Sequence, residues 1–368
     1  MIFHVLSIPI HPTRKEITLC AFTQKVYKFC KSMTERGHTV FHYGHPDSEV
    51  ICTKHFDVVS ASTYAETYQK QAWQDFLPQN VENKVHSEFN SNAARLIKKN
   101  KQSDHDFVLA FWGIGQLECC TALQDDFCIV EPSIGYESAF APFKVFESYA
   151  HLHKLHYKMY KNSPYASFTD HVIRPGFYFE DFLYKEEKQD YLLFLGRMVD
   201  GKGINIAQHL SKTSQIPIKF VGPQNLENKL EKDNKLAEYI HTVSWQDRKT
   251  LLANAKALIM PSLYLEPCGW SMLEAFISGT PVLSTDWGGL SEYNVHGKTG
   301  FRCKSFNEFF HAVHALDLIK PKVCRQYAEE NFEINTIAKM YENYFTHLLN
   351  TKKYGIGVAL DTCDFLVK

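Results

Sequence analysis

The sequence predicts an α/β protein made of two Rossmann-like domains, each a parallel β-sheet with helices on both faces. The chain has 368 residues, more than the roughly 250–300 at which one hydrophobic core stops growing. Hydrophobic residues make up 45% of it and charged residues 22%, as in an ordinary globular protein. Short apolar runs alternate with helix-period patterns along the whole chain, and this alternation favours two α/β domains.

The first domain is predicted over residues 1–170. A buried strand is expected at residues 3–8, and the apolar residues from Phe22 to Met33 then recur at helical spacing. Gly37 occupies the position at which a helix commonly ends. Later strands are expected at residues 38–43, 56–59, 106–111 and 127–130, and helices at residues 87–98 and 144–161.

The second domain is predicted over residues 171–335. The polar stretch at residues 178–189, near its start, has the composition of a connection between domains. The second domain repeats the strand-helix alternation of the first domain without repeating its sequence. Its strands are expected at residues 191–195, 218–221, 240–243, 257–260 and 281–284.

Charge and cysteine content exclude several classes of protein. Lys and Arg number 40 against 41 Asp and Glu, so no global field would recruit nucleic acid or anionic lipid. No nucleic-acid partner is predicted; peripheral membrane contact is left open but is not indicated. The ten cysteines include no CxxC pair, which argues against a zinc cluster and a disulfide framework and favours reduced thiols in a cytoplasmic protein. No export signal or membrane span is recognisable.

Metal binding is not predicted either. His151, His153 and His156 share one predicted helix, but their offsets of two and three residues do not reproduce the i, i+4 pair of a helical zinc site.

The most informative segment is residues 261–281. A strand ends near Met260, a loop carries Glu266, and Gly269 opens a helix whose first turn includes Trp270 and Ser271. The start of such a helix favours an anion, because its first N–H groups lack intrahelical partners. Glu266 and, inside the helix, Glu274 would accept hydrogen bonds from sugar hydroxyls rather than bind a phosphate. Two glutamates eight residues apart are also common on solvated helix faces.

A second segment, residues 195–203, follows a predicted strand directly. Gly196 and Arg197 lie at the carboxyl end of that strand, where open α/β sheets bind ligands, and Lys202 lies on the next turn. Two cations there suit a pyrophosphate. The alternative is an exposed turn with two ordinary surface charges.

Together with residues 279–282, 288–292 and 296–301, these segments resemble the retaining glycosyltransferases of family GT4, which have the GT-B fold. The resemblance covers residues 172–349. It implies two Rossmann-like domains facing across a cleft, and a last segment, residues 336–368, whose helix crosses back to the first domain before a tail.

The resemblance also implies roles for residues of the second domain. Arg197 and Lys202 would hold the diphosphate, Glu274 the ribose and Glu266 the donor sugar, so Arg197, Lys202 and Glu266 are the catalytic candidates. The donor-binding candidates are Gly196, Gly269, Trp270, Ser271 and Glu274.

The first domain departs from the family pattern. Residues 7–15 contain no glycine, although the family often has a glycine-rich loop there. A family histidine that follows a middle strand also has no assigned equivalent. The acceptor-side candidates are His11, Glu131, Ser133 and Tyr136.

The expected activity is that of a retaining hexosyltransferase that needs no cofactor. It would move a sugar from a UDP- or GDP-sugar to a hydroxyl of a glycan or other acceptor. Because no Asp-x-Asp motif stands in a matching context, the reaction is expected to be metal-independent, with the cations and the helix start stabilising the leaving charge. The alternatives are another GT-B enzyme, such as a phosphorylase or epimerase, and a non-catalytic nucleotide-sugar-binding protein.

Overall fold

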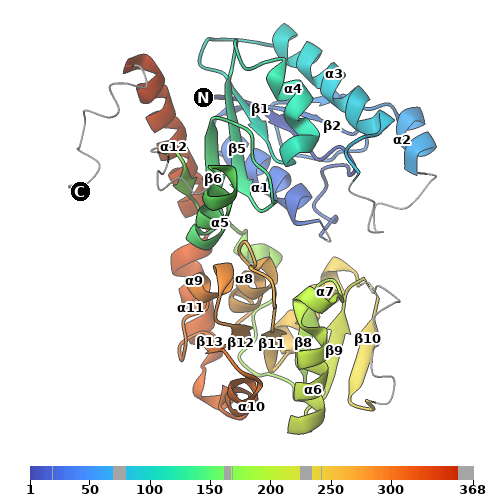
Figure 1. The fold of residues 1–368 in the computed structure, drawn as a ribbon, viewed down its shortest axis with the longest axis vertical. Helices are drawn as coiled ribbons and strands as arrows, with labels where there is room; N and C mark the ends of the chain where they lie inside the picture. The colour runs from blue at the N-terminus through green and yellow to red at the C-terminus, as the bar shows by residue number, and fades with distance from the viewer. Residues whose placement is uncertain are drawn as a thin grey trace. The chain divides into compact units, whose positions relative to one another are not determined.

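The computed structural model describes residues 1–354, except residues 19, 69–79, 161–166, 168, 224–233 and 242. The chain divides into two compact units (Figure 1). Unit 1 comprises Met1–Phe146, Met159–Gly176 and Ile334–Lys368, and unit 2 comprises Glu147–Lys158 and Phe177–Glu333. Within the described ranges, no helix has both the length and the apolar character needed to cross a membrane.

Unit 1 contains a seven-stranded sheet in the order β3-β2-β1-β4-β5-β6-β7, in which every pair is parallel. Its strands are β1 (Ile2–Leu6), β2 (Thr39–Gly44), β3 (Lys54–Asp57), β4 (Phe107–Ala110), β5 (Cys128–Ile134), β6 (Phe143–Phe146) and β7 (His171–Val172). Its α-helices are α1 (Ala21–Glu35), α2 (Ala61–Tyr68), α3 (Lys84–Lys99), α4 (Leu117–Thr121) and α12 (Ile334–Tyr354).

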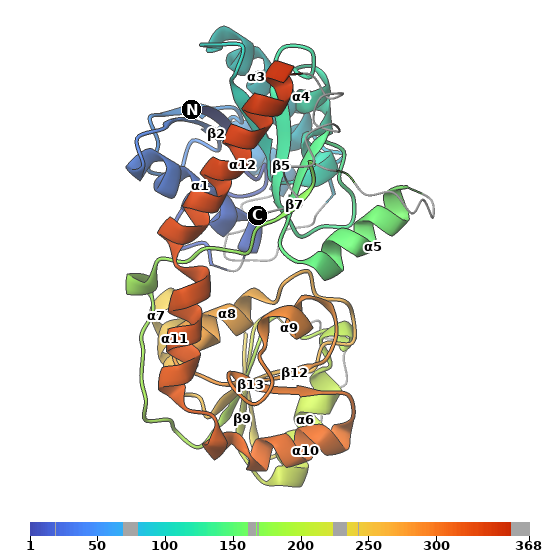
Figure 2. The same cartoon turned by 90° about the vertical axis from the view of Figure 1, so that its left-hand side faces the viewer.

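The central strand β1 is buried on both faces, as a parallel sheet requires. The Phe3 ring lies 5.5 Å from that of Phe29 on α1 and 4.8 Å from that of Phe345 on α12; these two helices pack side by side (Figure 2). His4 points to the opposite face, where its Nε2 lies 3.1 Å from an Asp106 carboxylate oxygen. Burial lowers the pKa of His4, so the imidazole is held there as a hydrogen-bonding group in an apolar core.

The last helix is fastened to unit 1 by Glu342. Its carboxylate accepts hydrogen bonds from Arg36 at 2.9 and 2.7 Å, and lies 2.9 Å from His38 Nε2. The hydrogen bonds from Arg36 lower the pKa of Glu342 to about 2. Glu342 therefore joins α12 to the end of α1 as a charged group.

Unit 2 contains a six-stranded parallel sheet in the order β10-β9-β8-β11-β12-β13. Its strands are β8 (Leu192–Leu195), β9 (Ile218–Val221), β10 (Ala237–Ile240), β11 (Ala257–Met260), β12 (Val282–Thr285) and β13 (Gly300–Cys303). Its α-helices are α5 (Tyr149–Met159), α6 (Ile204–Ser214), α7 (Trp245–Asn254), α8 (Trp270–Ile277), α9 (Gly288–Tyr293), α10 (Phe306–His314) and α11 (Pro321–Phe332).

Successive residues of β8 supply two separate cores. Leu192 and Phe194 pack with Leu210 of α6, whereas Leu193 packs with Phe276 of α8. The alternation follows from the two-residue period of a strand. An uninterrupted apolar run such as residues 192–195 thus marks a strand that is covered by helices on both sides.

Several predicted elements differ from the structure. Strands β9 and β11 have the predicted bounds, but β10 ends at Ile240, where the predicted strand began, and residue 242 of that strand lies outside the described residues. The predicted helix at residues 144–161 is wrong at its start, because residues 143–146 form β6. Strands β7 and β13 were not predicted, since neither contains an apolar run.

Residues 147–158 belong to unit 2, although the predicted domain boundary follows residue 170. Ser148 starts α5 by accepting a hydrogen bond from the His151 amide at 3.1 Å. The Glu292 carboxylate accepts from the next amides, those of Tyr149 at 3.0 Å and Ala150 at 2.6 Å. These contacts lie far apart in sequence, so periodicity could not reveal them.

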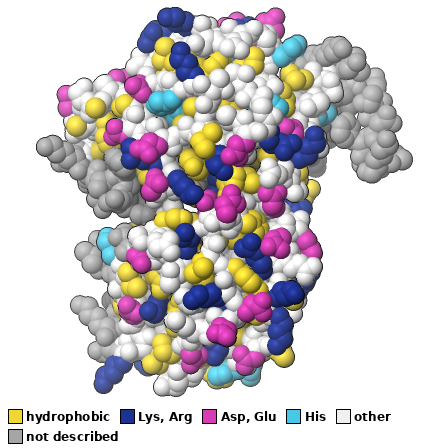
Figure 3. Space-filling model, turned by 180° about the vertical axis from the view of Figure 1, so that it is seen from behind, with side chains coloured by type: hydrophobic (Ala, Val, Ile, Leu, Met, Phe, Trp, Pro, Cys, Tyr) yellow, Lys and Arg dark blue, Asp and Glu magenta, His cyan; other side chains and the backbone are white. Residues whose placement is uncertain are grey.

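Charges of both signs occur on one face of the molecule. On the face drawn in Figure 3, basic and acidic side chains are interspersed. This distribution agrees with the near-equal totals of 40 basic and 41 acidic residues.

Candidate functional site

Two predicted functional segments meet at the carboxyl edge of the unit 2 sheet. Strands β8 and β11 are parallel neighbours, so the segments that follow them, residues 196–203 and 261–269, start side by side. The Leu263 amide donates to the Gly201 carbonyl at 2.8 Å. Gly203 has a φ of +72°, and a Cβ there would overlap the Pro261 carbonyl oxygen. The close approach of the two loops therefore depends on glycine.

Glu266 lies at the centre of this contact and is 4% exposed. Its Oε1 lies 2.5 Å from Lys202 Nζ and accepts from the Ser262 hydroxyl at 2.6 Å. Its Oε2 accepts from the Tyr264 hydroxyl at 2.5 Å. Three donors thus fix the carboxylate, which satisfies the general requirement that a buried charge be paired and hydrogen-bonded.

Lys202 is partly buried at the end of a short 3₁₀ turn, Asp200–Lys202, whereas Arg197 is exposed on the same loop. The structure therefore brings Lys202 and Glu266 together. Lys202 also donates to the Tyr264 hydroxyl at 2.9 Å. Tyr264 was missed, because a tyrosine in a loop carries no recognisable signal by itself.

Helix α8 begins at this edge. Gly269 precedes it with a φ of +87° and provides no side-chain cap. The neighbouring Trp270 indole donates to Glu147 at 2.9 Å, and the Ser271 hydroxyl lies 3.3 Å from the Leu195 carbonyl oxygen at the end of β8. The start of α8 is therefore held against β8, and its first backbone N–H groups suit an anion.

Glu274, on the same helix, is largely buried and forms an ion pair with Arg248 of α7. Arg248 was also missed by the sequence analysis. It lies 26 residues from Glu274, and helical periodicity places it on α7 without indicating its partner. Both glutamates singled out from the sequence thus face a cation in the structure.

The Gly288 and Gly289 turn supports the Glu266 loop. The Gly289 amide donates to the Glu266 carbonyl at 2.8 Å, and a Cβ on Gly288 would lie 2.9 Å from the Glu266 nitrogen. These contacts explain why two glycines begin α9. The helix thus fixes the backbone from which the Glu266 carboxylate projects.

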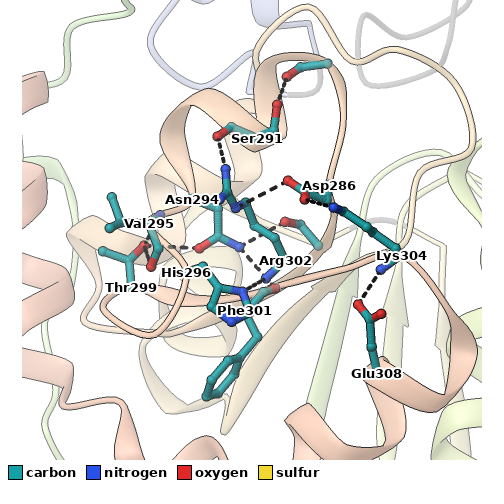
Figure 4. A network of polar contacts seen from close by, with 12 residues as sticks. Asp286, Ser291, Asn294, Val295, His296, Thr299, Phe301, Arg302, Lys304 and Glu308 are labelled. Atoms are coloured by element: carbon teal, nitrogen blue, oxygen red, sulfur yellow. Dashed lines mark hydrogen bonds and ion pairs between the residues drawn. The ribbon is translucent and has the colours of Figure 1, made fainter.

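A polar network fastens α9 in turn to the sheet edge. Figure 4 shows Arg302 between Ser291 and Asp286: its Nη1 donates to the Ser291 carbonyl at 2.7 Å, and its Nε lies 3.3 Å from the Asp286 carboxylate. Lys304 lies 3.4 Å from the same carboxylate. Asp286 is therefore occupied in a structural ion-pair network.

In unit 1, His11 follows β1 and is 6% exposed. Burial lowers its pKa to about 4, and its buried Nδ1 has no hydrogen-bond partner. A neutral imidazole with an unsatisfied nitrogen could donate to or accept from a hydroxyl ligand.

The other acceptor-side candidates hold the loop that follows β5. Glu131 is fully buried and accepts hydrogen bonds from the Tyr136 hydroxyl at 2.9 Å and from the amides of Phe140 and Ala141 at 2.7 and 2.8 Å. Burial raises its pKa. Ser133 has a φ of +58°. Glu131 and Tyr136 are thus brought together: Tyr136 donates to Glu131, and Glu131 holds the backbone at Phe140 and Ala141.

No group of three or more His, Cys, Asp or Glu residues within the described part of the chain is arranged to hold a metal ion.

Most of unit 2 matches a protein-family model. Residues 179–329 match the family model described as Glycosyl transferases group 1. The matched range contains every site residue proposed in unit 2.

Curated relatives match part of the chain. A granule-bound starch synthase 1 of Ipomoea batatas is 29% identical over 34% of this chain and 22% of its own length. An uncharacterized glycosyltransferase of Methanocaldococcus jannaschii is 27% identical over 41% of this chain and 44% of its own. A glycogen synthase of Mycobacterium tuberculosis is 32% identical, over 30% of each. The alignments thus span less than half the length of these relatives.

Solved structures resemble nearly the whole chain. AviGT4, a glycosyltransferase involved in avilamycin A biosynthesis, has a TM-score of 0.69 at 19% identity and covers 95% of this chain and 98% of its own. A sucrose-phosphate synthase from Thermosynechococcus elongatus has a TM-score of 0.70 at 15% identity, covering 95% and 99%. Anabaena HepE in complex with UDP and glucose has a TM-score of 0.65 at 12% identity, covering 94% and 100%. These likenesses and the two parallel sheets confirm the predicted GT-B fold class.

Proposed function

We propose, on the premise that residues 179–329 form a group 1 glycosyltransferase domain in a GT-B fold, that this protein transfers a glycosyl unit from a nucleoside diphosphate sugar to an acceptor hydroxyl. One observation carries the proposal: Lys202 and the buried Glu266 meet on the sheet edge at which α8 begins without a side-chain cap. A cation and a helix start suit a diphosphate, and a fixed carboxylate suits a sugar hydroxyl.

The proposed roles follow from the charges. Lys202, Arg197 and the start of α8 stabilise the negative charge that grows on the diphosphate as the bond between the sugar and the phosphate breaks. The new bond forms between the same sugar carbon and the acceptor oxygen, and the proton of the acceptor hydroxyl leaves with the diphosphate. Glu266 orients the donor sugar by accepting one of its hydroxyls.

Glu274 binds the ribose in this proposal. Its ion pair with Arg248 involves Oε2 and leaves Oε1 to accept a hydroxyl. Gly196, Trp270 and Ser271 complete the donor side. The reaction is further proposed to retain the anomeric configuration, to transfer a hexose and to need no metal, as the GT4 resemblance implies.

The acceptor is proposed to bind to unit 1, with His11 as the side chain that contacts it. His11 supports this role because it is buried, neutral at physiological pH and has one unsatisfied nitrogen. Glu131 and Tyr136 support acceptor binding indirectly, because they fix the loop after β5.

Thermal unfolding with UDP-glucose, GDP-mannose and ADP-glucose tests donor binding, because a ligand of the native state raises Tm by mass action. A rise of several degrees with one donor, lost in Lys202→Ala, is expected. Turnover of that donor is then followed with and without glycan acceptors.

The products distinguish the alternatives. Transfer only with an acceptor supports the proposal. Isomerisation of the donor without acceptor would indicate an epimerase, and release of the sugar as its 1-phosphate upon adding inorganic phosphate would indicate a phosphorylase. A Tm rise without turnover would indicate a nucleotide-sugar-binding protein.

A further inference from the structure

The Tyr264 hydroxyl lies between the two charged groups of the proposed site. It accepts a hydrogen bond from Lys202 Nζ at 2.9 Å and donates to Glu266 Oε2 at 2.5 Å. The direction is fixed, because an ammonium can only donate, a carboxylate can only accept, and a phenol has one proton. Tyr264 is therefore an oriented bridge from the cation to the carboxylate.

The ring of Tyr264 makes a second contact with the same cation. Lys202 Nζ lies 4.8 Å from the ring centroid, within the distance at which a cation is attracted to an aromatic face. The Tyr264 backbone is held as well, since its amide lies 3.4 Å from the Gly201 carbonyl oxygen. Both parts of the side chain therefore act on Lys202.

The three donors to Glu266 are not equivalent. Lys202 and Ser262 share Oε1, whereas among the residues that the structure describes Tyr264 alone is bonded to Oε2. If a diphosphate draws the Lys202 ammonium toward itself, Oε1 keeps Ser262 and Oε2 keeps Tyr264. Two hydrogen bonds, one on each oxygen, still hold the plane of the carboxylate.

We propose that Tyr264 is a positioning residue that keeps the Glu266 carboxylate aligned while Lys202 engages the donor diphosphate. The inference rests on the proposed function and adds a residue to it. It requires the hydroxyl and not merely the ring, because only the hydroxyl reaches Glu266. It also requires the effect to act through Glu266.

The first test compares Tyr264→Phe with wild type, using UDP-glucose, GDP-mannose and ADP-glucose as donors. Loss of a hydrogen bond to a carboxylate that acts in the transition state should lower kcat about tenfold. The KM for the donor should stay within twofold, because the phenyl ring still faces Lys202. An unchanged kcat, or a rise in KM at constant kcat, would overturn the proposal.

Tyr184→Phe is the matched control. The Tyr184 hydroxyl also donates to a glutamate, Glu186, at 3.0 Å within unit 2, but outside the two loops of the site. This variant should keep wild-type kcat and KM. Equal losses in both variants would assign the effect to general destabilisation and overturn the proposal.

A second test needs no donor. Urea unfolding of wild type, Tyr264→Phe, Glu266→Ala and the double variant measures the coupling between the two positions. We expect Tyr264→Phe to lower the unfolding midpoint in the wild-type background and to have little effect once Glu266 is removed. Additive effects would overturn the proposal. If no donor is turned over by wild type, the proposed function fails, and this cycle still decides whether Tyr264 acts through Glu266.

Discussion

The Lys202 ammonium lies 2.5 Å from the Glu266 carboxylate, although 64 residues separate the two positions. They meet because β8 and β11 are parallel neighbours, so the loops after them begin at one edge of the sheet. In the proposed function, Lys202 is the cation that holds the diphosphate and Glu266 the carboxylate that accepts a sugar hydroxyl. The first prediction concerns that cation.

Lys202→Ala and Arg197→Ala should each lower kcat by about 10²-fold, as the loss of one preorganised charge donor typically does. Lys256→Ala is the control, because Lys256 pairs with Asp190 at 2.8 Å and precedes β11 instead of following it. Steady-state kinetics with the donor found by thermal shift checks the prediction, and circular dichroism checks folding. Near-normal turnover in both site variants would exclude the diphosphate assignment.

The two glutamates should separate by role. Glu274→Gln is expected to weaken binding of the free nucleoside diphosphate about tenfold, because the ribose loses a charged acceptor. Glu266→Gln should leave that affinity almost intact and lower the rate of transfer. Calorimetry with UDP, GDP and ADP measures the affinities. Equal losses of nucleotide affinity would contradict the division into ribose and sugar contacts.

Gly203 lies where the loops after β8 and β11 touch, and its substitution should destabilise the protein more than that of an unhindered glycine. Gly203→Ala adds both a left-handed strain and an overlap with Pro261, and should cost roughly 3 kcal/mol of unfolding free energy. Gly297→Ala is the matched control, since Gly297 has a φ of +76° and nothing within 4 Å of a Cβ; it should cost roughly 1 kcal/mol. Urea unfolding compares the two, and equal costs would show that the loops do not need to touch there.

Glu342 should make stability depend on pH in the acid range. Its pKa is about 2 in the folded protein, because Arg36 and His38 favour the charged form, against about 4.5 in the unfolded chain. Its contribution is therefore complete above pH 4.5 and is lost as the pH falls toward 2. Glu342→Gln should cost roughly 2 kcal/mol at pH 7.

Denaturant unfolding at several pH values checks this prediction. The difference between wild type and Glu342→Gln should shrink as the pH falls below 4.5. Glu330→Gln on the exposed face of α11 serves as control and should change stability by less than about 0.5 kcal/mol. A constant difference between pH 7 and pH 3 would show that Glu342 is not held charged by Arg36.

The sequence by itself determined the doubly wound architecture and the donor-side candidates. Strand β11 was predicted with its observed bounds because a strand buried on both faces is an uninterrupted apolar run, and β9 because Lys219 alone interrupts its run. Glu266 and Lys202 were identified because each stands in a loop directly after such a strand. An apolar run and the charged loop residue that follows it are close together in the chain, so both can be recognised from the sequence alone.

The elements that sequence reasoning missed depend on partners far away in the chain. Strand β13 is held by pairing with β12 and contains Gly300 and Arg302, so it has no apolar run to recognise. Residues 147–158 join unit 2 because Glu292 accepts the first amides of α5. Local sequence patterns do not reveal these contacts, so the predicted domain boundary was placed after residue 170.

The same distinction applies to the site. Sequence supplied the charged residues, but only the tertiary structure showed that Glu274 pairs with Arg248, that Tyr264 bridges Lys202 to Glu266, and that Glu131 is committed to its own loop. The physical reason is that chain propensities are set over a few residues, whereas a buried charge must find its partner wherever the fold brings one within hydrogen-bond distance.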